Sequence, residues 1–239
     1  MSKTIALSGR EDVSRFMVHL TRDDRDDYSD GGSAKSNLLS ILREKRIRAI
    51  APHCTFNKPL RKLPDTIAKR FNTVCLTETP LNQVHLLVRD IPGRRIKLAP
   101  YGICFRKEFI VDVGGQPAIY LNEYNGNTWL RECVDELYAT SVTKKAVIRP
   151  LWRILPFVNS MHEGYDFSWE REWRVRGDLR FSSRDIVCVI LPSNREEPLK
   201  ERMATAGIAT ISPGWTYEQI VAELATQQRA TRSITKALE

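Results

Sequence analysis

The sequence lacks any run approaching the roughly 20 apolar residues that a membrane-spanning helix requires. Its first residues, MSKTIALSGREDVSRF, contain neither an apolar signal core nor a small-residue cleavage site. These two absences predict a cytoplasmic protein without a membrane partner. The five cysteines are odd in number and include no CxxC pair. Because Cys75 and Cys104 stand in apolar runs, we expect buried, reduced thiols rather than disulfides or a zinc site.

The short motifs of several large enzyme classes are also missing. The sequence contains no G-x-S-x-G elbow, no Walker A loop and no G-x-G-x-x-G turn. Hydrolases and nucleoside triphosphatases are therefore disfavoured. The four histidines have no HxxxH or HExxH spacing, so we predict no metal site; they are His19, His53, His85 and His162.

What is present is an ordinary globular composition with a basic balance. The chain of 239 residues is 42% hydrophobic and 28% charged, and its length suits one large domain. We find no internal repeat and no clear linker, so we interpret residues 1–239 as a single domain that ends in a helix at about 216–239. The 37 Lys and Arg residues exceed the 29 Asp and Glu residues, which gives a net charge of +8. This charge is compatible with a phosphate-rich partner but does not identify one.

Hydrophobic periodicity predicts strands in the middle of the chain and helices towards both ends, hence one α+β domain. The predicted strands lie at 15–21, 71–79, within 99–113, and at 117–121, 168–175, 186–191 and 208–211. The predicted helices lie at 36–47, 81–88, 129–143, 197–206 and 217–239. Ser36 or Asn37 is the expected cap of the first helix.

The segment WEREWRVR at 169–176 carries the densest chemistry in the sequence. If it is a strand, Glu170 and Glu172 point the same way, about 6–7 Å apart, while Trp173 and Val175 face the core. At this distance one carboxylate can bind a sugar hydroxyl while the other supports an electron-poor centre. The alternative is an exposed strand in which Glu and Arg side chains pair with each other.

The order of the motifs resembles that of ADP-ribosyltransferases. A strand with His-Leu-Thr at 19–21 and a helix with Asn-Leu-Leu-Ser-Ile-Leu at 37–42 are similar to the start of DarT-type enzymes, which modify nucleic acids. The runs VCLTETPL, YGICFRKEF, GGQPAIYLNE and WEREWR also look like AbiGi-type abortive-infection proteins. The resemblance covers about three quarters of the chain. It implies a mixed, split central β-sheet flanked by helices and a reaction that uses NAD as a substrate, without a metal.

The resemblance assigns roles to the acidic and hydroxyl residues. Glu172 is the implied catalytic carboxylate, which stabilises the oxocarbenium-like sugar formed as nicotinamide leaves. Glu170 is the implied companion that orients or deprotonates the acceptor. Thr77 and Thr79 take the place of the hydroxyl cluster on the second strand. Here the sequence reads Thr-Glu-Thr, where the familiar cluster is Ser-Thr-Ser.

The remaining implied contacts with NAD come from three other places in the chain. His19 would bind the NAD ribose with Thr21 beside it, although a lone histidine among apolar residues also fits a satisfied core position. Tyr101 would stack on nicotinamide, or else be a core aromatic at a strand edge. Arg106 would meet the pyrophosphate, or else lie on a solvated strand edge.

The acceptor and the partners follow from the charge and from the resemblance. Basic residues at 43–48 and 58–70 favour a nucleic acid, RNA or DNA, although an acidic protein side chain remains open. The resemblance implies a bacterial toxin or anti-phage effector, with a neutralising antitoxin and a chaperone as candidate partners. The alternative function is a non-enzymatic antitoxin or regulatory protein that binds a partner.

Overall fold

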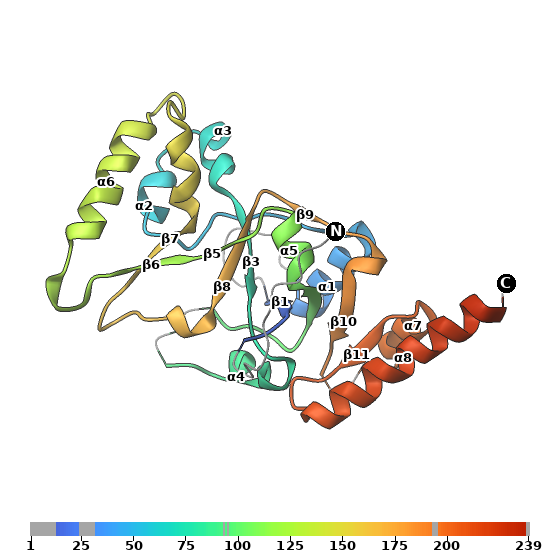
Figure 1. The fold of residues 1–239 in the computed structure, drawn as a ribbon. Coiled ribbons are helices and arrows are strands. Elements are labelled where there is room, and N and C mark those ends of the chain that lie inside the picture. The colour runs from blue at the N-terminus through green and yellow to red at the C-terminus, as the bar shows by residue number, and fades with distance from the viewer. Residues whose placement is uncertain (1–12, 24–31, 93, 95, 193–195, 238–239) are drawn as a thin grey trace.

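A computed structural model describes residues 13–23, 32–92, 94, 96–192 and 196–237. Within these residues a seven-stranded sheet forms the centre of the molecule, in the order β11–β10–β4–β1–β3–β8–β5 (Figure 1). Its strands are β1 Phe16–Leu20, β3 Thr73–Thr77, β4 Gly102–Arg106, β5 Gln116–Pro117, β8 Glu172–Arg176, β10 Ile186–Ile190 and β11 Ala209–Ile211. The sheet is mixed, because β10 and β11 are parallel while the other neighbouring strands are antiparallel. The fold is therefore α+β.

The pairing between β1 and β3 is the shortest in the sheet. Strand β1 pairs with β4 through five successive Cα pairs, but with β3 through the single pair Val18↔Thr77. Strand β3 then pairs with β8 through five Cα pairs. The short ladder between β1 and β3 leaves main-chain groups of β3 available to side chains.

Helices cover both faces of this sheet because each face is apolar. On one face, α1 Ala34–Glu44, α5 Lys107–Asp112 and α7 Glu197–Thr205 pack against a cluster that includes Met17, Ile103 and Val175. On the other, η2 Leu81–Gln83, α4 His85–Val88 and α8 Tyr217–Ala237 cover a cluster that includes Val18 and Cys104. All five cysteines are free thiols.

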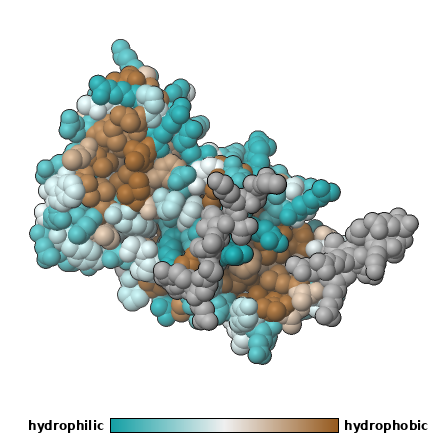
Figure 2. All heavy atoms as spheres, in the orientation of Figure 1, coloured by the Kyte–Doolittle hydropathy of each residue, from teal (hydrophilic) through white to brown (hydrophobic). Residues whose placement is uncertain are grey.

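A group of short elements lies beside the β8–β5 edge of the sheet, in the upper left of Figure 1. It holds α2 Asn57–Leu60, α3 Asp65–Ala68, α6 Trp129–Ser141, η4 Pro150–Phe157 and the parallel pair β6 Ile119–Asn122 and β7 Val158–Met161. These elements enclose a separate apolar cluster around Phe56, Phe71 and Trp152. Figure 2 shows apolar side chains gathered over this end of the molecule, where Leu151 and Ile154 are exposed.

The remaining elements are short. Strand β2 Arg46–Ile47 pairs with β9 Leu179–Arg180 in a two-stranded antiparallel sheet. Single turns of 3-10 helix occur at η1 Lys69–Phe71, η3 Tyr124–Gly126, η5 Ser168–Glu170 and η6 Ser183–Asp185. Among the described residues, none of the helices has the length and apolar character needed to cross a bilayer.

Most of the predicted elements are confirmed, with three corrections. The first helix begins at Ala34, two residues before its predicted start, and its cap is the Ser33 side chain, which accepts a hydrogen bond from the Ser36 N–H. The strand predicted within 99–113 is confirmed as β4, and the helix α5 that follows it was not predicted. The predicted strand at 168–175 begins only at Glu172, because 168–170 form a 3-10 turn and Arg171 has left-handed backbone angles.

Candidate active site

Thr77, the last residue of β3, lies directly opposite Glu172, the first residue of β8. In the ladder between the two strands, Thr77 is the Cα partner of Glu172, so both side chains leave the sheet on the same face. The Thr77 hydroxyl also lies 2.9 Å from the Thr79 hydroxyl and donates to the main-chain oxygen of Glu170. The structure thus brings together Thr77, Thr79, Glu170 and Glu172.

A buried arginine holds the Glu172 carboxylate. The Arg174 Nε donates to Glu172 Oε1 at 2.9 Å, and its Nη2 donates to Oε2 at 2.7 Å. The same guanidinium donates to the main-chain oxygens of Pro156 and His53, and its side chain is 0% exposed. Burial alone would lower the pKa of Arg174, but the Glu172 charge and hydrogen bonds outweigh burial and raise it. Glu172 is consequently fixed in one orientation by a paired, fully bonded cation.

Two neutral groups complete the surroundings of Glu172. The Tyr120 hydroxyl, from β6, lies 3.4 Å from Glu172 Oε2. Burial, and next the Glu172 charge, raise the pKa of Tyr120, so its hydroxyl stays protonated and donates to the carboxylate. Burial and the same charge raise the pKa of the Cys75 thiol. Cys75 is therefore not an activated nucleophile.

Glu170 occupies a different setting from Glu172. It ends the 3-10 turn η5, and its Oε1 lies 3.0 Å from the Arg94 Nη2, with side-chain exposures of 21% and 10%. Burial raises the pKa of Glu170 and the nearby Glu172 charge raises it further, whereas Arg94 lowers it. A carboxylate whose pKa is raised is a stronger base at neutral pH than an ordinary glutamate. The predicted shared strand face for Glu170 and Glu172 is wrong, but both carboxylates remain close neighbours in the fold.

Glu78, the middle residue of Thr-Glu-Thr, belongs to the opposite face of the sheet. Its Oε2 accepts a hydrogen bond from Trp173 Nε1 at 2.9 Å and pairs with Lys107 Nζ at 2.9 Å. The Lys107 ammonium also lies 5.0 Å from the centroid of a Trp173 ring. This buried group joins β3, β8 and α5 and is separate from the cluster around Glu172.

His19 lies at the short pairing between β1 and β3. Because Val18 is the partner of Thr77, alternation places Val18 on the Glu172 face and His19 on the other. The His19 Nδ1 lies 2.8 Å from the main-chain oxygen of Cys75. A carbonyl only accepts, so Nδ1 carries the proton, and burial lowers the pKa of the ring. The imidazole is neutral, and its Nε2 is an acceptor.

The structure does not bring the other three predicted residues to Glu172. The Thr21 hydroxyl donates to the main-chain oxygens of Ala34 and Tyr101, which ties the end of β1 to α1. The Tyr101 hydroxyl donates to Glu196 Oε1 at 2.7 Å, beside the start of α7. Arg106 is exposed at the end of β4 and precedes α5.

Sequence reasoning missed Arg174, Tyr120 and Arg94 as members of this site. Alternation along β8 did place Arg174 on the Glu172 face, and that pattern is the signal that could have found it. The sequence gives no signal for Arg94, whose side chain the structure places beside Glu170 with 10% exposure. Among the described residues, no group of three or more His, Cys, Asp or Glu side chains is arranged to hold a metal ion.

Comparison of the chain with protein-family models, curated proteins and solved structures finds no match. The geometry of the site and the motif resemblance are therefore the grounds for a proposed function.

Proposed function

We propose that the protein is an NAD-dependent ADP-ribosyltransferase that modifies a nucleic acid, RNA or DNA, and acts as a bacterial toxin or anti-phage effector. The observation that carries the proposal is the order of three neighbouring strands. Strand β1 with His19, β3 with Thr77 and β8 with Glu172 lie side by side, and Thr77 is the direct partner of Glu172. The resemblance requires these three strands to meet at one NAD site.

The chemistry proposed for Glu172 is stabilisation of positive charge. The bond between the ribose C1 and the nicotinamide nitrogen breaks, and nicotinamide leaves with the bonding electron pair. The Glu172 carboxylate, fixed by Arg174, stabilises the positive sugar and accepts a hydrogen bond from a ribose hydroxyl. The protonated Tyr120 hydroxyl keeps the second carboxylate oxygen in place.

Glu170 is the proposed general base. A lone pair of the acceptor base forms the new bond to the ribose C1, and Glu170 removes the proton that the acceptor nitrogen or oxygen loses. Its raised pKa and its place beside Glu172 support this role. Thr77 positions Glu170 through the hydrogen bond to its main-chain oxygen.

His19 is proposed to contact the ribose at the point where the pairing between β1 and β3 ends. Its neutral ring has Nδ1–H directed at the Cys75 oxygen, which leaves Nε2 to accept from a ribose hydroxyl. Because alternation places His19 and Glu172 on opposite faces, the NAD ribose would have to lie where the ladder is interrupted. Thr21 and Tyr101 have no part in the proposed NAD site, because their hydroxyls bond elsewhere in the fold.

One observation favours the alternative, a non-enzymatic antitoxin or regulatory protein. Both oxygens of Glu172 are occupied by Arg174, as expected of a structural ion pair. In that case the protein would not cleave NAD, and Glu172 would contribute only to folding.

The test is to incubate the protein with NAD labelled on its adenylate phosphate and with total cellular DNA, RNA and protein in separate reactions. The proposal expects label in the DNA or the RNA fraction, removed by the matching nuclease, together with free nicotinamide. The alternative expects no label in any fraction and no nicotinamide. Label in protein alone would reject a nucleic-acid acceptor.

A further inference from the structure

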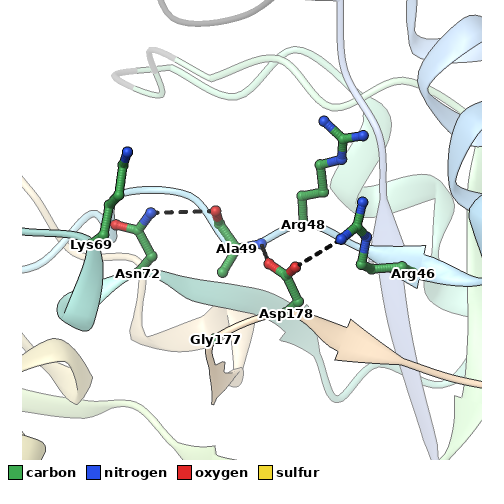
Figure 3. A pocket seen from close by; sticks show the side chains of 7 residues that line it. All are labelled: Arg46, Arg48, Ala49, Lys69, Asn72, Gly177 and Asp178. Atoms are coloured by element: carbon green, nitrogen blue, oxygen red, sulfur yellow. Dashed lines mark hydrogen bonds and ion pairs between the residues drawn. The ribbon is translucent and has the colours of Figure 1, made fainter. Parts of the chain in front are cut away.

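An open, basic hollow lies at the far end of β8 from Glu172. Its volume is about 470 Å³, and Figure 3 shows the residues that line it: Arg46, Arg48, Ala49, Lys69, Asn72, Gly177 and Asp178. They come from three places in the chain, namely β2 with the residues after it, the turn η1, and the turn between β8 and β9. The hollow is thus built by the tertiary fold and not by one loop.

The negative charge in the hollow is already neutralised. The Asp178 Oδ1 accepts a hydrogen bond from the Ala49 N–H at 2.8 Å, and its Oδ2 lies 3.5 Å from Arg46. Arg46 and Arg48 both bind Glu44, at 2.8 and 2.9 Å. Glu44, Asp178 and the Asp65 carboxylate beside Lys69 therefore match the three lining cations in number. The positive balance comes from basic residues next to the lining residues in the chain.

Two cations at the rim of the hollow, Arg48 and Lys69, are exposed and accessible to an anion from solution. The side chains of Arg48 and Lys69 are 66% and 72% exposed, and both point up from the hollow in Figure 3. Lys69 Nζ lies 3.8 Å from the exposed carboxylate of Asp65. Such a surface ion pair contributes little free energy, so a phosphate would readily displace the Asp65 carboxylate from Lys69. Arg48 presents a planar fork that matches a phosphate.

The adjoining ladder carries an unusual pair of like charges. In the sheet formed by β2 and β9, Arg46 and Arg180 are direct Cα partners. Arg46 is paired with Glu44 and Asp178, so the exposed Arg180 is the member of this pair that adds positive charge to the ladder. Four further exposed basic residues stand next to lining residues or to Glu44 in the chain, namely Arg43, Lys45, Arg70 and Arg176.

We infer that this hollow binds a backbone phosphate of a nucleic-acid strand. The relation to catalysis rests on the proposed function: from Gly177 to Glu172 is five residues of extended chain, about 17 Å. A few nucleotides of a single strand span that distance. A strand anchored in the hollow would therefore present a base at Glu172 a few positions away.

The experiment measures binding without NAD. Fluorescence anisotropy follows fluorescein-labelled single-stranded DNA and RNA of one sequence, about 20 nucleotides long, at about 50 to 200 mM salt. The test variant is Arg48→Gln/Lys69→Gln. The control is Lys144→Gln/Lys145→Gln, which removes the same charge from two exposed lysines between α6 and η4. Urea unfolding of each variant verifies that it folds like the wild type.

Loss of two phosphate contacts on a single strand should reduce the salt slope by about 1.4 and weaken binding about 25-fold at 0.1 M salt. The control should bind like the wild type, whether or not the protein proves to be a transferase. The inference is overturned if the wild type binds neither oligonucleotide, or if the control loses as much affinity as the test variant. It is also overturned if free NAD at an equal phosphate concentration displaces the strand.

Discussion

Arg174 binds both carboxylate oxygens of Glu172 although the two residues are separated by one position in the same strand. The guanidinium is 0% exposed and also donates to main-chain oxygens from two other segments, at His53 and Pro156. A single side chain thus connects β8 to the short elements beside the sheet and sets the direction of Glu172. Stability and the proposed chemistry depend on the same contact.

Replacement of Arg174 by Leu should therefore cost stability. The change leaves a largely buried carboxylate and two main-chain oxygens without their partner, a loss of about 4 kcal/mol in the free energy of unfolding. Arg174→Lys should lose less, because lysine keeps the charge but not the fork. Urea unfolding measures both variants.

The matched control for Arg174→Leu is Arg180→Leu, at an exposed position of β9. It should change the free energy of unfolding by less than about 0.5 kcal/mol. If Arg174→Leu were equally mild, the buried pair would not have the structural role described.

Replacement of Glu78 by Gln should lower the stability of the protein without removing its proposed activity. Glu78→Gln can still accept from Trp173 Nε1, but it removes the counter-charge of the buried Lys107, at a cost of about 3 kcal/mol. Because Glu78 faces away from Glu172, transfer of label from NAD should persist at a temperature where the variant is folded. Loss of transfer by a folded Glu78→Gln variant would contradict this assignment of the two faces.

The acid limb of the pH–rate profile should depend on Arg94. Glu170 acts as a base only in its charged form, so activity falls as the pH drops through its pKa, which lies above the ordinary value. Arg94 lowers that pKa, and Arg94→Gln should raise it and move the acid limb to higher pH. The measurement is kcat/KM for nicotinamide release across the acid range.

Lys97→Gln is the control for Arg94→Gln, because Lys97 pairs with Asp90 nearby in the chain but both side chains are exposed. Its acid limb should match that of the wild type. An acid limb unchanged in Arg94→Gln would remove Glu170 from the role of general base.

Local sequence patterns predicted most strands and helices because side-chain burial follows the expected period in segments such as 74–77, where Val74 and Leu76 are buried and the residues after each are less so. The order of the strands could not be predicted, since the pairing of Thr77 with Glu172 is a long-range contact between strands far apart in the chain. The interruption of the predicted strand at Arg171 was missed, because nothing in WEREWR indicates that a residue other than glycine has left-handed backbone angles there.

Two charged residues show why the site itself was only partly predicted. Alternation indicated that Arg174 lies on the side away from Trp173 and Val175, which suggested an exposed side chain. The neighbouring segments at His53 and Pro156 cover that side and bury it. Arg94 stands in a loop among polar residues, and only the fold reveals its partner Glu170.

The most direct test of the account is nicotinamide release and label transfer by Glu172→Gln, compared with Glu123→Gln. Glu123 is also partly buried and paired, with Arg131 at 3.2 Å, but belongs to the elements beside the sheet. Folded Glu172→Gln should lose both activities by at least about 100-fold, an effect typical of removing a group that stabilises transition-state charge. Glu123→Gln should keep both activities. Wild-type rates in a folded Glu172→Gln variant, or no NAD cleavage by the wild type with any nucleic acid, would contradict the account.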